Sequence, residues 1–235
     1  MPHIDMIGFD ADDTLWHNET HYSNAKQRFG QLLSAYGEPE AIIRQLDETE
    51  MENVHSYGYG IKSFALSMVE TAVKISGGQV HGREILAIIE LAKEALDTEV
   101  ILFDHVEEML ASLSEGYNLL LITKGDTFEQ ERKIKRTGLA GYFQHIEIVA
   151  EKSAAVYRGI LRKYAVAHTR FLMVGNSLRS DVQPVVEIGG QAVYIPYQHT
   201  WAHENMIEQP IDDGAYHEIE HLGQLSDLII DLGNI

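Results

Sequence analysis

Five short apolar runs, separated over the second half of the chain by helical patterns, constrain its fold more than any other feature. The runs are rich in Val, Ile, Leu and Tyr, and nearly all of their residues are apolar. Apolar strands that alternate with amphipathic helices are typical of a parallel sheet covered on both faces. The sequence therefore predicts a doubly wound, mainly parallel α/β fold with strands at residues 4–10, 117–123, 145–149, 170–175 and 191–196.

The stretch between the first and second of these runs has a helical spacing of apolar residues. Three amphipathic stretches lie at residues 25–36, 61–75 and 85–96, and Gly or Pro follows the first two. Both residue types are common just beyond the end of a helix. We therefore expect an all-helical cap domain at residues 17–99, inserted into an α/β catalytic core formed by residues 1–16 and 100–235.

The composition narrows the range of partners. The formal net charge of −18 opposes binding to nucleic acids or anionic membranes, because those partners attract clustered Lys and Arg. Cysteine is absent, which excludes disulfides, thiolate catalysis and Cys-ligated metals. No window approaches the roughly 20 apolar residues of a membrane span, and the first residues lack a secretory pattern. These features predict a cytoplasmic protein that acts on a small molecule, with no nucleic acid or membrane partner.

Polar side chains follow four of the predicted strands at the points where these strands end. In open parallel sheets, ligands bind at the carboxyl ends of the strands, so we expect these side chains to meet at one edge. Carboxylates, a hydroxyl and an ammonium group together suit a hard cation such as Mg2+ and a phosphoryl group. One carboxylate can attack phosphorus, and a second can move a proton. The residues at these strand ends are Asp10, Asp12, Thr14, Thr123, Lys124, Glu151, Lys152, Gly175, Asn176, Ser177 and Asp181.

The order and spacing of these residues resemble the four signatures of the haloacid dehalogenase superfamily of phosphotransferases. The stretch Asp-Ala-Asp-Asp-Thr at residues 10–14 is similar to the first signature, Asp-x-Asp-x-Thr/Val. Thr123 ends an apolar strand as in the second signature, and Lys152 matches the third. Gly-Asn-x4-Asp at residues 175–181 matches the fourth, Gly-Asp-x4-Asp, imperfectly. The resemblance implies a Rossmann-like core, and the helical insertion resembles the family's C1-type cap.

The resemblance also implies a role for each matched residue. Asp10 would be the nucleophile and a Mg2+ ligand, and Asp12 would be the general acid and base, with its backbone carbonyl also contacting the metal. Thr123 and Lys152 would bind the phosphoryl oxygens. Asp181 would bind or orient the metal. The implied activity is that of a phosphoric monoester hydrolase, a Mg2+-dependent phosphatase acting on a small phosphorylated metabolite through an aspartyl phosphate.

Asn176 departs from the family pattern, in which Asp is usual. An amide oxygen can still ligate Mg2+ directly or through water, but it adds no charge, so we expect weaker metal binding. Three alternatives remain open: a haloacid dehalogenase, a phosphomutase and a non-catalytic binding protein. Dehalogenases of this family lack the second acid, so the presence of Asp12 favours the phosphatase.

The helical insertion contains candidate specificity residues. A Gly-Tyr stretch at residues 55–62 lies ahead of an expected helix. Because the cap of this family contacts the leaving group of the substrate, the resemblance implies that Tyr57, Tyr59 and Lys62 contribute to substrate specificity. The alternative is that this stretch only connects two helices.

Overall fold

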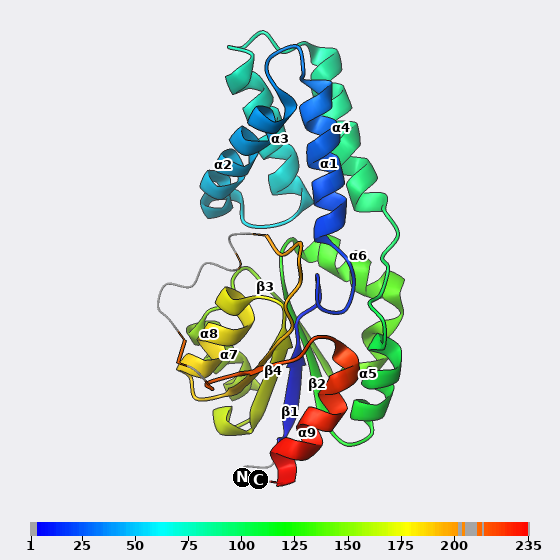
Figure 1. Cartoon of the computed structure of the whole chain (residues 1–235), viewed down its shortest axis with the longest axis vertical. Helices are drawn as coiled ribbons and strands as arrows, with labels where there is room; N and C mark the ends of the chain where they lie inside the picture. Colours follow the sequence, from blue (N-terminus) through cyan, green and yellow to red (C-terminus); the bar gives the residue numbers. More distant parts are fainter. Residues whose placement is uncertain (1–3, 202–203, 205–210, 213, 235) are drawn as a thin grey trace. The chain divides into compact units, whose positions relative to one another are not determined.

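The computed structural model describes residues 4–201, 204, 211–212 and 214–234, and the chain divides into two units (Figure 1). The α/β unit comprises Met1–His17, Val100–Lys124 and Glu131–Ile235, and the helical unit comprises Asn18–Glu99 and Gly125–Gln130. The segment Gly125–Gln130 thus groups with the helical unit, whereas the sequence assigned it to the α/β core. Among the described residues, every helix is too short or too polar to span a bilayer.

A six-stranded, wholly parallel sheet forms the centre of the α/β unit, in the order β3-β2-β1-β4-β5-β6. Five of these strands lie where the apolar runs predict them, which confirms the doubly wound α/β fold class. The sixth, β6 (His217–Glu218), is too short to produce a pattern in the sequence. The others are β1 (Met6–Phe9), β2 (Asn118–Lys124), β3 (His145–Val149), β4 (Phe171–Gly175) and β5 (Gln191–Tyr194).

Alternate residues of the central strands pack into separate apolar cores on the two faces of the sheet. On β1, Ile7 joins the core that contains residues of α5 (Val106–Ser114) and α9 (Leu225–Asn234). Met6 joins the core formed with α7 (Ala154–Lys163) and α8 (Gln183–Glu187). Figure 1 shows these helices on either side of the strands. Because both faces are covered, both sets of side chains must be apolar, which produces the continuous apolar runs in the sequence.

The helical unit packs four helices around one apolar core. Its helices are α1 (Glu19–Leu32), α2 (Pro39–Tyr57), α3 (Ile61–Ile75) and α4 (Gly82–Asp97). The sequence did not predict α2 as a separate helix. Its buried positions Ile42, Leu46, Thr49 and Asn53 have helical spacing, but half of them are polar, so the apolar period is missing.

Local signals account for the boundaries of α2. Pro39 occupies its first turn, where the missing N–H costs no hydrogen bond, and Gly58 follows its last residue with φ +71°.

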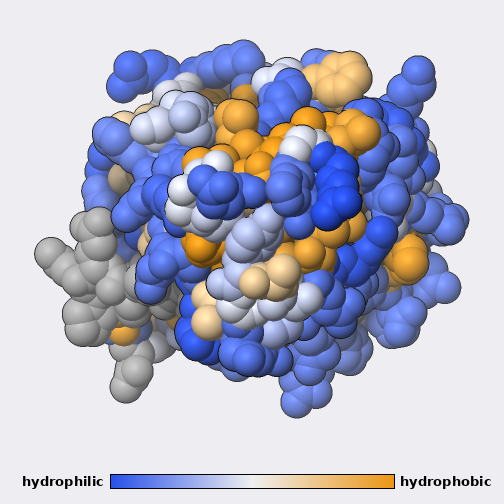
Figure 2. Space-filling view, turned by 90° about the horizontal axis from the view of Figure 1, so that it is seen from above, coloured by the Kyte–Doolittle hydropathy of each residue, from blue (hydrophilic) through white to orange (hydrophobic). Residues whose placement is uncertain are grey.

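Outside the core, several large apolar side chains of the helical unit are exposed, among them Leu66, Val73 and Leu86. Figure 2 shows apolar groups between hydrophilic side chains on the face that it views.

The helix α6 (Thr127–Thr137) is divided between the two units, since its first residues group with the helical unit and the rest with the α/β unit. Shorter turns complete the connections of the α/β unit. They are η1 (Leu139–Tyr142), η2 (His168–Arg170), the π-helical turn η3 (Leu178–Val182) and η5 (Leu222–Gln224).

Candidate active site

The sheet order fixes where a site can form in the α/β unit. β1 lies between β2 and β4, so the chain leaves β1 toward one side of the sheet and later returns to the other. Ligands of open α/β sheets bind at this switch point, beyond the carboxyl ends of the strands. Asp10 directly follows β1, and Asn176 directly follows β4. The topology therefore brings the first and fourth predicted signatures to neighbouring strand ends.

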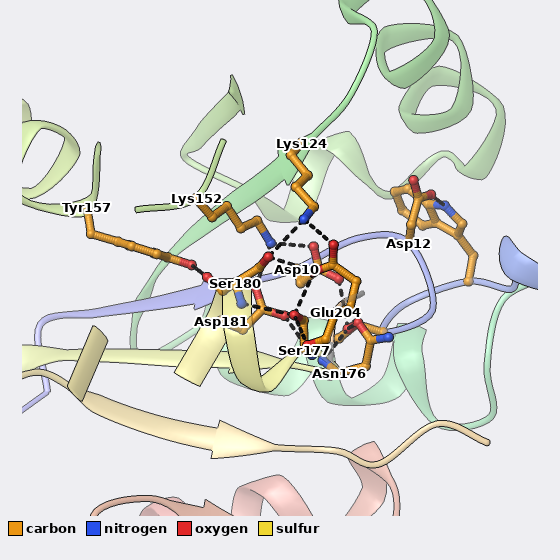
Figure 3. Close-up of polar contacts among 12 residues, drawn as sticks. Asp10, Asp12, Lys124, Lys152, Tyr157, Asn176, Ser177, Ser180, Asp181 and Glu204 are labelled. Atoms are coloured by element: carbon orange, nitrogen blue, oxygen red, sulfur yellow. Dashed lines mark hydrogen bonds and ion pairs between the residues drawn. The ribbon is translucent and has the colours of Figure 1, made fainter. Parts of the chain in front are cut away.

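Lys152 joins two of the predicted carboxylates. Its Nζ donates to Asp10 Oδ1 at 2.5 Å and to Asp181 Oδ1 at 2.7 Å, as Figure 3 shows. The side chains of Lys152 and Asp181 are each 1% exposed and that of Asp10 is 10% exposed. Three residues far apart in the sequence thus form one buried cluster, which we call the Lys152 cluster.

Burial and charge act against each other in the Lys152 cluster. Burial alone would lower the pKa of Lys152, but the carboxylates of Asp10 and Asp181 raise the pKa above its ordinary value, so the ammonium stays charged. Burial raises the pKa of Asp181, Lys152 opposes this shift, and Asp10 adds to it. With both carboxylates ionised, the cluster holds one excess negative charge, which makes it a suitable place for a cation.

The backbone around Asp181 brings its carboxylate close to the end of β4. A Cβ on Gly175 would lie 2.2 Å from Asp181 Oδ2, so only glycine leaves room for this approach. The backbone N–H of Ser177 donates to the same oxygen at 3.0 Å. Asp181 lies in the π-helical turn η3, and such turns are frequent at functional sites. The hydroxyl of the buried Tyr157 donates to the carbonyl oxygen of Ser180 in the same turn, at 3.0 Å.

Thr14 connects Asp10 with Asn176. Its Oγ1 lies 3.0 Å from Asp10 Oδ2 and 3.2 Å from Asn176 Oδ1, and one hydroxyl proton serves both acceptors. The same Oγ1 accepts the backbone N–H of Asn176 at 3.1 Å. The side-chain amide of Asn176 donates to Thr200 Oγ1 at 3.1 Å. Asn176 is therefore oriented with its carbonyl oxygen toward the residues around Asp10.

Asp12 has different partners. Trp16 Nε1 donates to Asp12 Oδ1 at 2.7 Å, and Lys133 Nζ donates to both carboxylate oxygens at 2.8 and 2.7 Å. Figure 3 shows the Asp12 side chain apart from the Lys152 cluster. The two acids of the first signature therefore have separate surroundings, and each has its own lysine.

Glu204, whose side chain is 12% exposed, is a further carboxylate that the sequence did not predict. It accepts Lys124 Nζ at 2.5 Å, Ser177 Oγ at 2.7 Å and Ser180 Oγ at 2.6 Å (Figure 3). Burial by itself would raise its pKa, but the Lys124 ammonium and the two hydroxyls lower the pKa of Glu204 to about 2. Lys124 and Ser177 are among the polar residues expected at the strand ends, whereas nothing in the sequence around Glu204 marks it.

The remaining predicted residues lie in both units. Thr123 is 1% exposed near the end of β2, on the strand adjacent to β1. Tyr57 ends α2 and is exposed, and Tyr59 is half-buried in the connection to α3. Lys62, in the first turn of α3, forms an ion pair with Asp126 at 2.9 Å. The specificity roles of the three helical-unit residues remain predictions.

The oxygen donors around Asp10 fit Mg2+. Two carboxylates, Asp10 and Asp181, share Lys152, and Asp10 shares Thr14 with the amide oxygen of Asn176. Within the described part of the chain, no three His, Cys, Asp or Glu residues are arranged to hold a metal ion. Mg2+ needs no such group, because it is typically held by one or two carboxylates and keeps several waters. The donors are all hard oxygen atoms, as this ion prefers.

Comparisons with known proteins identify the family of the chain. Residues 4–189 match the family model of the haloacid dehalogenase-like hydrolases. The chain belongs to this family. The resemblance read from the four signatures is thereby confirmed, and the protein is a hydrolase of the haloacid dehalogenase-like family.

Three proteins show how this family hydrolase compares over most of its length. The glyceraldehyde 3-phosphate phosphatase of Pyrococcus abyssi is 29% identical over 207 residues, which cover 83% of this chain and 82% of that protein. A haloacid dehalogenase-like family hydrolase from Xanthomonas campestris is 33% identical, with a TM-score of 0.85 over 100% of both chains. The L-2-haloacid dehalogenase of Xanthobacter autotrophicus, at 16% identity and a TM-score of 0.65 over 97% and 98% of the chains, shares the fold.

Proposed function

We propose that this family hydrolase is a Mg2+-dependent phosphatase that removes the phosphoryl group of a small phosphorylated metabolite through an aspartyl phosphate on Asp10. The observation that carries the proposal is the position of Asp10. It follows the central strand at the switch point of the sheet, and its carboxylate contacts the charged Lys152 and the hydroxyl of Thr14. The phosphatase activity named for the Pyrococcus abyssi relative supports the same reaction.

The reaction has two steps. In the first, an oxygen of Asp10 forms a bond to phosphorus while the bond from phosphorus to the leaving oxygen breaks, and Asp12 gives its proton to that oxygen. In the second, a water oxygen bonds to phosphorus, Asp12 takes a proton from this water, and the bond between Asp10 and phosphorus breaks. Free phosphate and the alcohol are the products, and both aspartates return to their starting forms.

The separate surroundings of Asp10 and Asp12 suit these two roles. The leaving oxygen lies on the far side of phosphorus from the nucleophile, because the attacking and leaving oxygens are roughly in line. The acid must therefore stand away from Asp10, as Asp12 does in Figure 3. Lys152 and Thr123 would offset the charge that develops on the phosphoryl oxygens.

Asp10, Asp181, Asn176 and the backbone carbonyl of Asp12 would hold Mg2+. When bound, the ion offsets the negative charge of the phosphoryl group and of the two carboxylates. Asn176 contributes an oxygen without charge, so we expect that replacing Asn176 by Asp lowers the Mg2+ concentration needed for half-maximal activity. Isothermal titration of Mg2+ measures the same change without substrate.

A phosphate-release screen tests the proposal. The panel contains glyceraldehyde 3-phosphate, phosphoglycolate, sugar phosphates, nucleotides, flavin mononucleotide and 4-nitrophenyl phosphate, each with Mg2+ and with excess chelator. We expect Mg2+-dependent release from at least one metabolite, with none from the Asp10→Asn variant. Phosphate release that survives Asp10→Asn, or that is unchanged in chelator, would contradict the proposal.

The amide of Asn176 favours one alternative, a haloacid dehalogenase, because this position lacks the usual acid and its oxygen shares Thr14 with Asp10. Such an enzyme uses Asp10 to attack carbon and releases halide. Halide release from 2-chloropropionate, with no phosphate release from the panel, would establish this alternative.

A further inference from the structure

The helix α6 carries contacts that belong to both units. Its start groups with the helical unit, and from Glu131 onward it belongs to the α/β unit. Glu129 and Lys133 lie four residues apart on this helix, so their side chains occupy the same side of it. Glu129 contacts residues of the helical unit, and Lys133 contacts a carboxylate of the α/β unit.

Glu129 ties the start of α6 to the start of α3. It is 6% exposed, and its Oε2 accepts the backbone N–H of Ile61, the first residue of α3, at 2.7 Å. Its Oε1 accepts the hydroxyl of Tyr22 on α1 at 3.2 Å. Gly60 has φ +110°, and a Cβ there would lie 2.9 Å from the same Oε2, so the approach requires glycine. A carboxylate at a helix N-terminus is stabilised by N–H groups that lack partners within the helix.

Lys133, one turn later, holds the carboxylate of Asp12. Its Nζ contacts both Asp12 oxygens, and the side chains of Lys133 and Asp12 are 13% and 20% exposed. Trp16 donates a third hydrogen bond to the same carboxylate. Three donors on two oxygens leave the side chain little rotational freedom, so the direction of Asp12 follows the position of Lys133.

We propose that Lys133 is a positioning residue for Asp12, and that α6 links the position of Lys133 to the helical unit through Glu129. This inference rests on the proposed function, in which Asp12 protonates the leaving oxygen. A helix moves as a rigid element, so a displacement of α3 that carries Glu129 along also displaces Lys133. The helical unit then affects the acid through one continuous element of the chain.

The first test compares substrates whose leaving groups differ in their need for an acid. The leaving oxygen of an alkyl phosphate must be protonated as it departs. The leaving oxygen of 4-nitrophenyl phosphate needs a proton far less. We expect Lys133→Met to slow the single-turnover cleavage of the alkyl phosphate by about 10- to 100-fold, and that of 4-nitrophenyl phosphate by less than about threefold. KM should change little. Lys133→Arg should restore most of the rate, because guanidinium can also hold both carboxylate oxygens.

Matched variants on the same helix control for charge and folding. Lys135 and Glu131 are exposed, so Lys135→Met and Glu131→Gln should match the wild type. Glu129→Gln should also slow cleavage of the alkyl phosphate more than that of 4-nitrophenyl phosphate. The loss of rate should be smaller than in Lys133→Met, about threefold on the alkyl phosphate. An equal loss on both substrates, or no loss beyond that of Lys135→Met, would overturn the role of Lys133. Glu129→Gln behaving as Glu131→Gln would overturn the link to the helical unit.

A spectroscopic measurement tests the same contacts without turnover. The indole N–H of Trp16 donates to Asp12, so its nitrogen-proton correlation signal reports the direction of that carboxylate. We expect this signal to shift in Lys133→Met and in Glu129→Gln, and to stay in place in Lys135→Met. An unmoved signal in both would contradict the proposal. If the wild type itself releases no phosphate from either substrate, the proposed function is contradicted, and this inference loses its basis.

Discussion

In each unit of the molecule, a lysine whose side chain is at most 10% exposed contacts two carboxylates. The two clusters have the same chemical composition and similar distances, with the lysine nitrogen 2.5 to 2.7 Å from each carboxylate. They differ in burial and in the origin of their residues. In the α/β unit, the Lys152 cluster consists of Lys152, Asp10 and Asp181. In the helical unit, the second cluster, which we call the Lys26 cluster, consists of Lys26, Asp47 and Glu50.

The Lys26 cluster joins two helices that are neighbours in the sequence, α1 and α2. Asp47 is 45% exposed there, so water shares its charge. Burial raises the pKa of Glu50, and Lys26 opposes that shift. An excess negative charge in contact with water costs little free energy, so this cluster is sufficiently explained by the packing of α1 against α2.

The Lys152 cluster has no comparable access to water, since its side chains are at most 10% exposed. Its residues follow three different strands and meet at the switch point of the sheet. A buried cluster with one excess negative charge stabilises the fold poorly, which favours a role in binding or catalysis. Burial and position, rather than residue composition, therefore separate the proposed functional cluster from the Lys26 cluster.

The largest expected effect comes from removing one carboxylate from each cluster. Asp10→Asn should reduce phosphate release by more than about 10⁴-fold, because the amide cannot form the acyl phosphate. Asp47→Asn removes the corresponding charge of the Lys26 cluster and should leave kcat within about twofold of wild type. Comparable activities of these two variants would break the functional distinction between the clusters.

Removing the lysines should separate the clusters in stability. Lys152→Met leaves two buried carboxylates without their cation and should lower the free energy of unfolding by about 3–5 kcal/mol. Lys26→Met should cost about 1–2 kcal/mol, because the exposed Asp47 can be solvated. Urea unfolding at neutral pH measures both values. Equal losses would show that burial does not distinguish the two lysines.

Glu204 provides a third case, in which one carboxylate has one lysine and two hydroxyls. Its pKa is about 2 in the folded state against an ordinary 4.5, so the unfolded chain binds the proton more readily. The resulting stabilisation is complete above pH 4.5 and is lost as the pH falls toward 2. It amounts to roughly 3 kcal/mol. The difference in unfolding free energy between wild type and Glu204→Gln should shrink over this range, and a constant difference would contradict the assignment.

The smallest expected effect concerns the helical unit. If Lys62 contacts the substrate, Lys62→Ala should lower kcat/KM for an anionic metabolite by about 3- to 10-fold and leave 4-nitrophenyl phosphate nearly unaffected, because one surface ion contact is weak. The ratio of the two specificity constants is measured. Because Lys62 pairs with Asp126, Asp126→Asn serves as the control for loss of that ion pair. An unchanged ratio would assign the stretch around Lys62 to a connecting role.

The sequence was sufficient to predict five of the six strands of the sheet and most of the polar residues that follow them. Asp10, Lys152, Asn176 and Asp181 were predicted because a parallel sheet places strand ends together and because their spacing resembles known signatures. Which of them share a hydrogen bond was not predictable, since Lys152 lies between two carboxylates only in three dimensions.

The missed residues have a common physical reason. Lys133 and Glu129 lie on a helix with ordinary amphipathic character, and Glu204 lies in a stretch without periodicity, so neither local pattern nor spacing marks them. Their contacts are made across the fold, between residues 24 to 121 positions apart. α2 was missed for the related reason that its buried face includes Thr49 and Asn53, whose polarity hides the helical period.

The most direct test of the central claim follows oxygen atoms through the reaction. The enzyme turns over its best phosphorylated substrate in water enriched in heavy oxygen, and mass spectrometry then locates the label. If Asp10 forms an aspartyl phosphate that water cleaves at phosphorus, acid-quenched enzyme contains a phosphorylated Asp10 peptide, the released phosphate gains the heavy oxygen, and the Asp10 carboxyl gains none. Absence of the phosphorylated peptide would contradict the account, and so would heavy oxygen in the Asp10 side chain, because that label requires attack by water on the carboxyl carbon rather than on phosphorus.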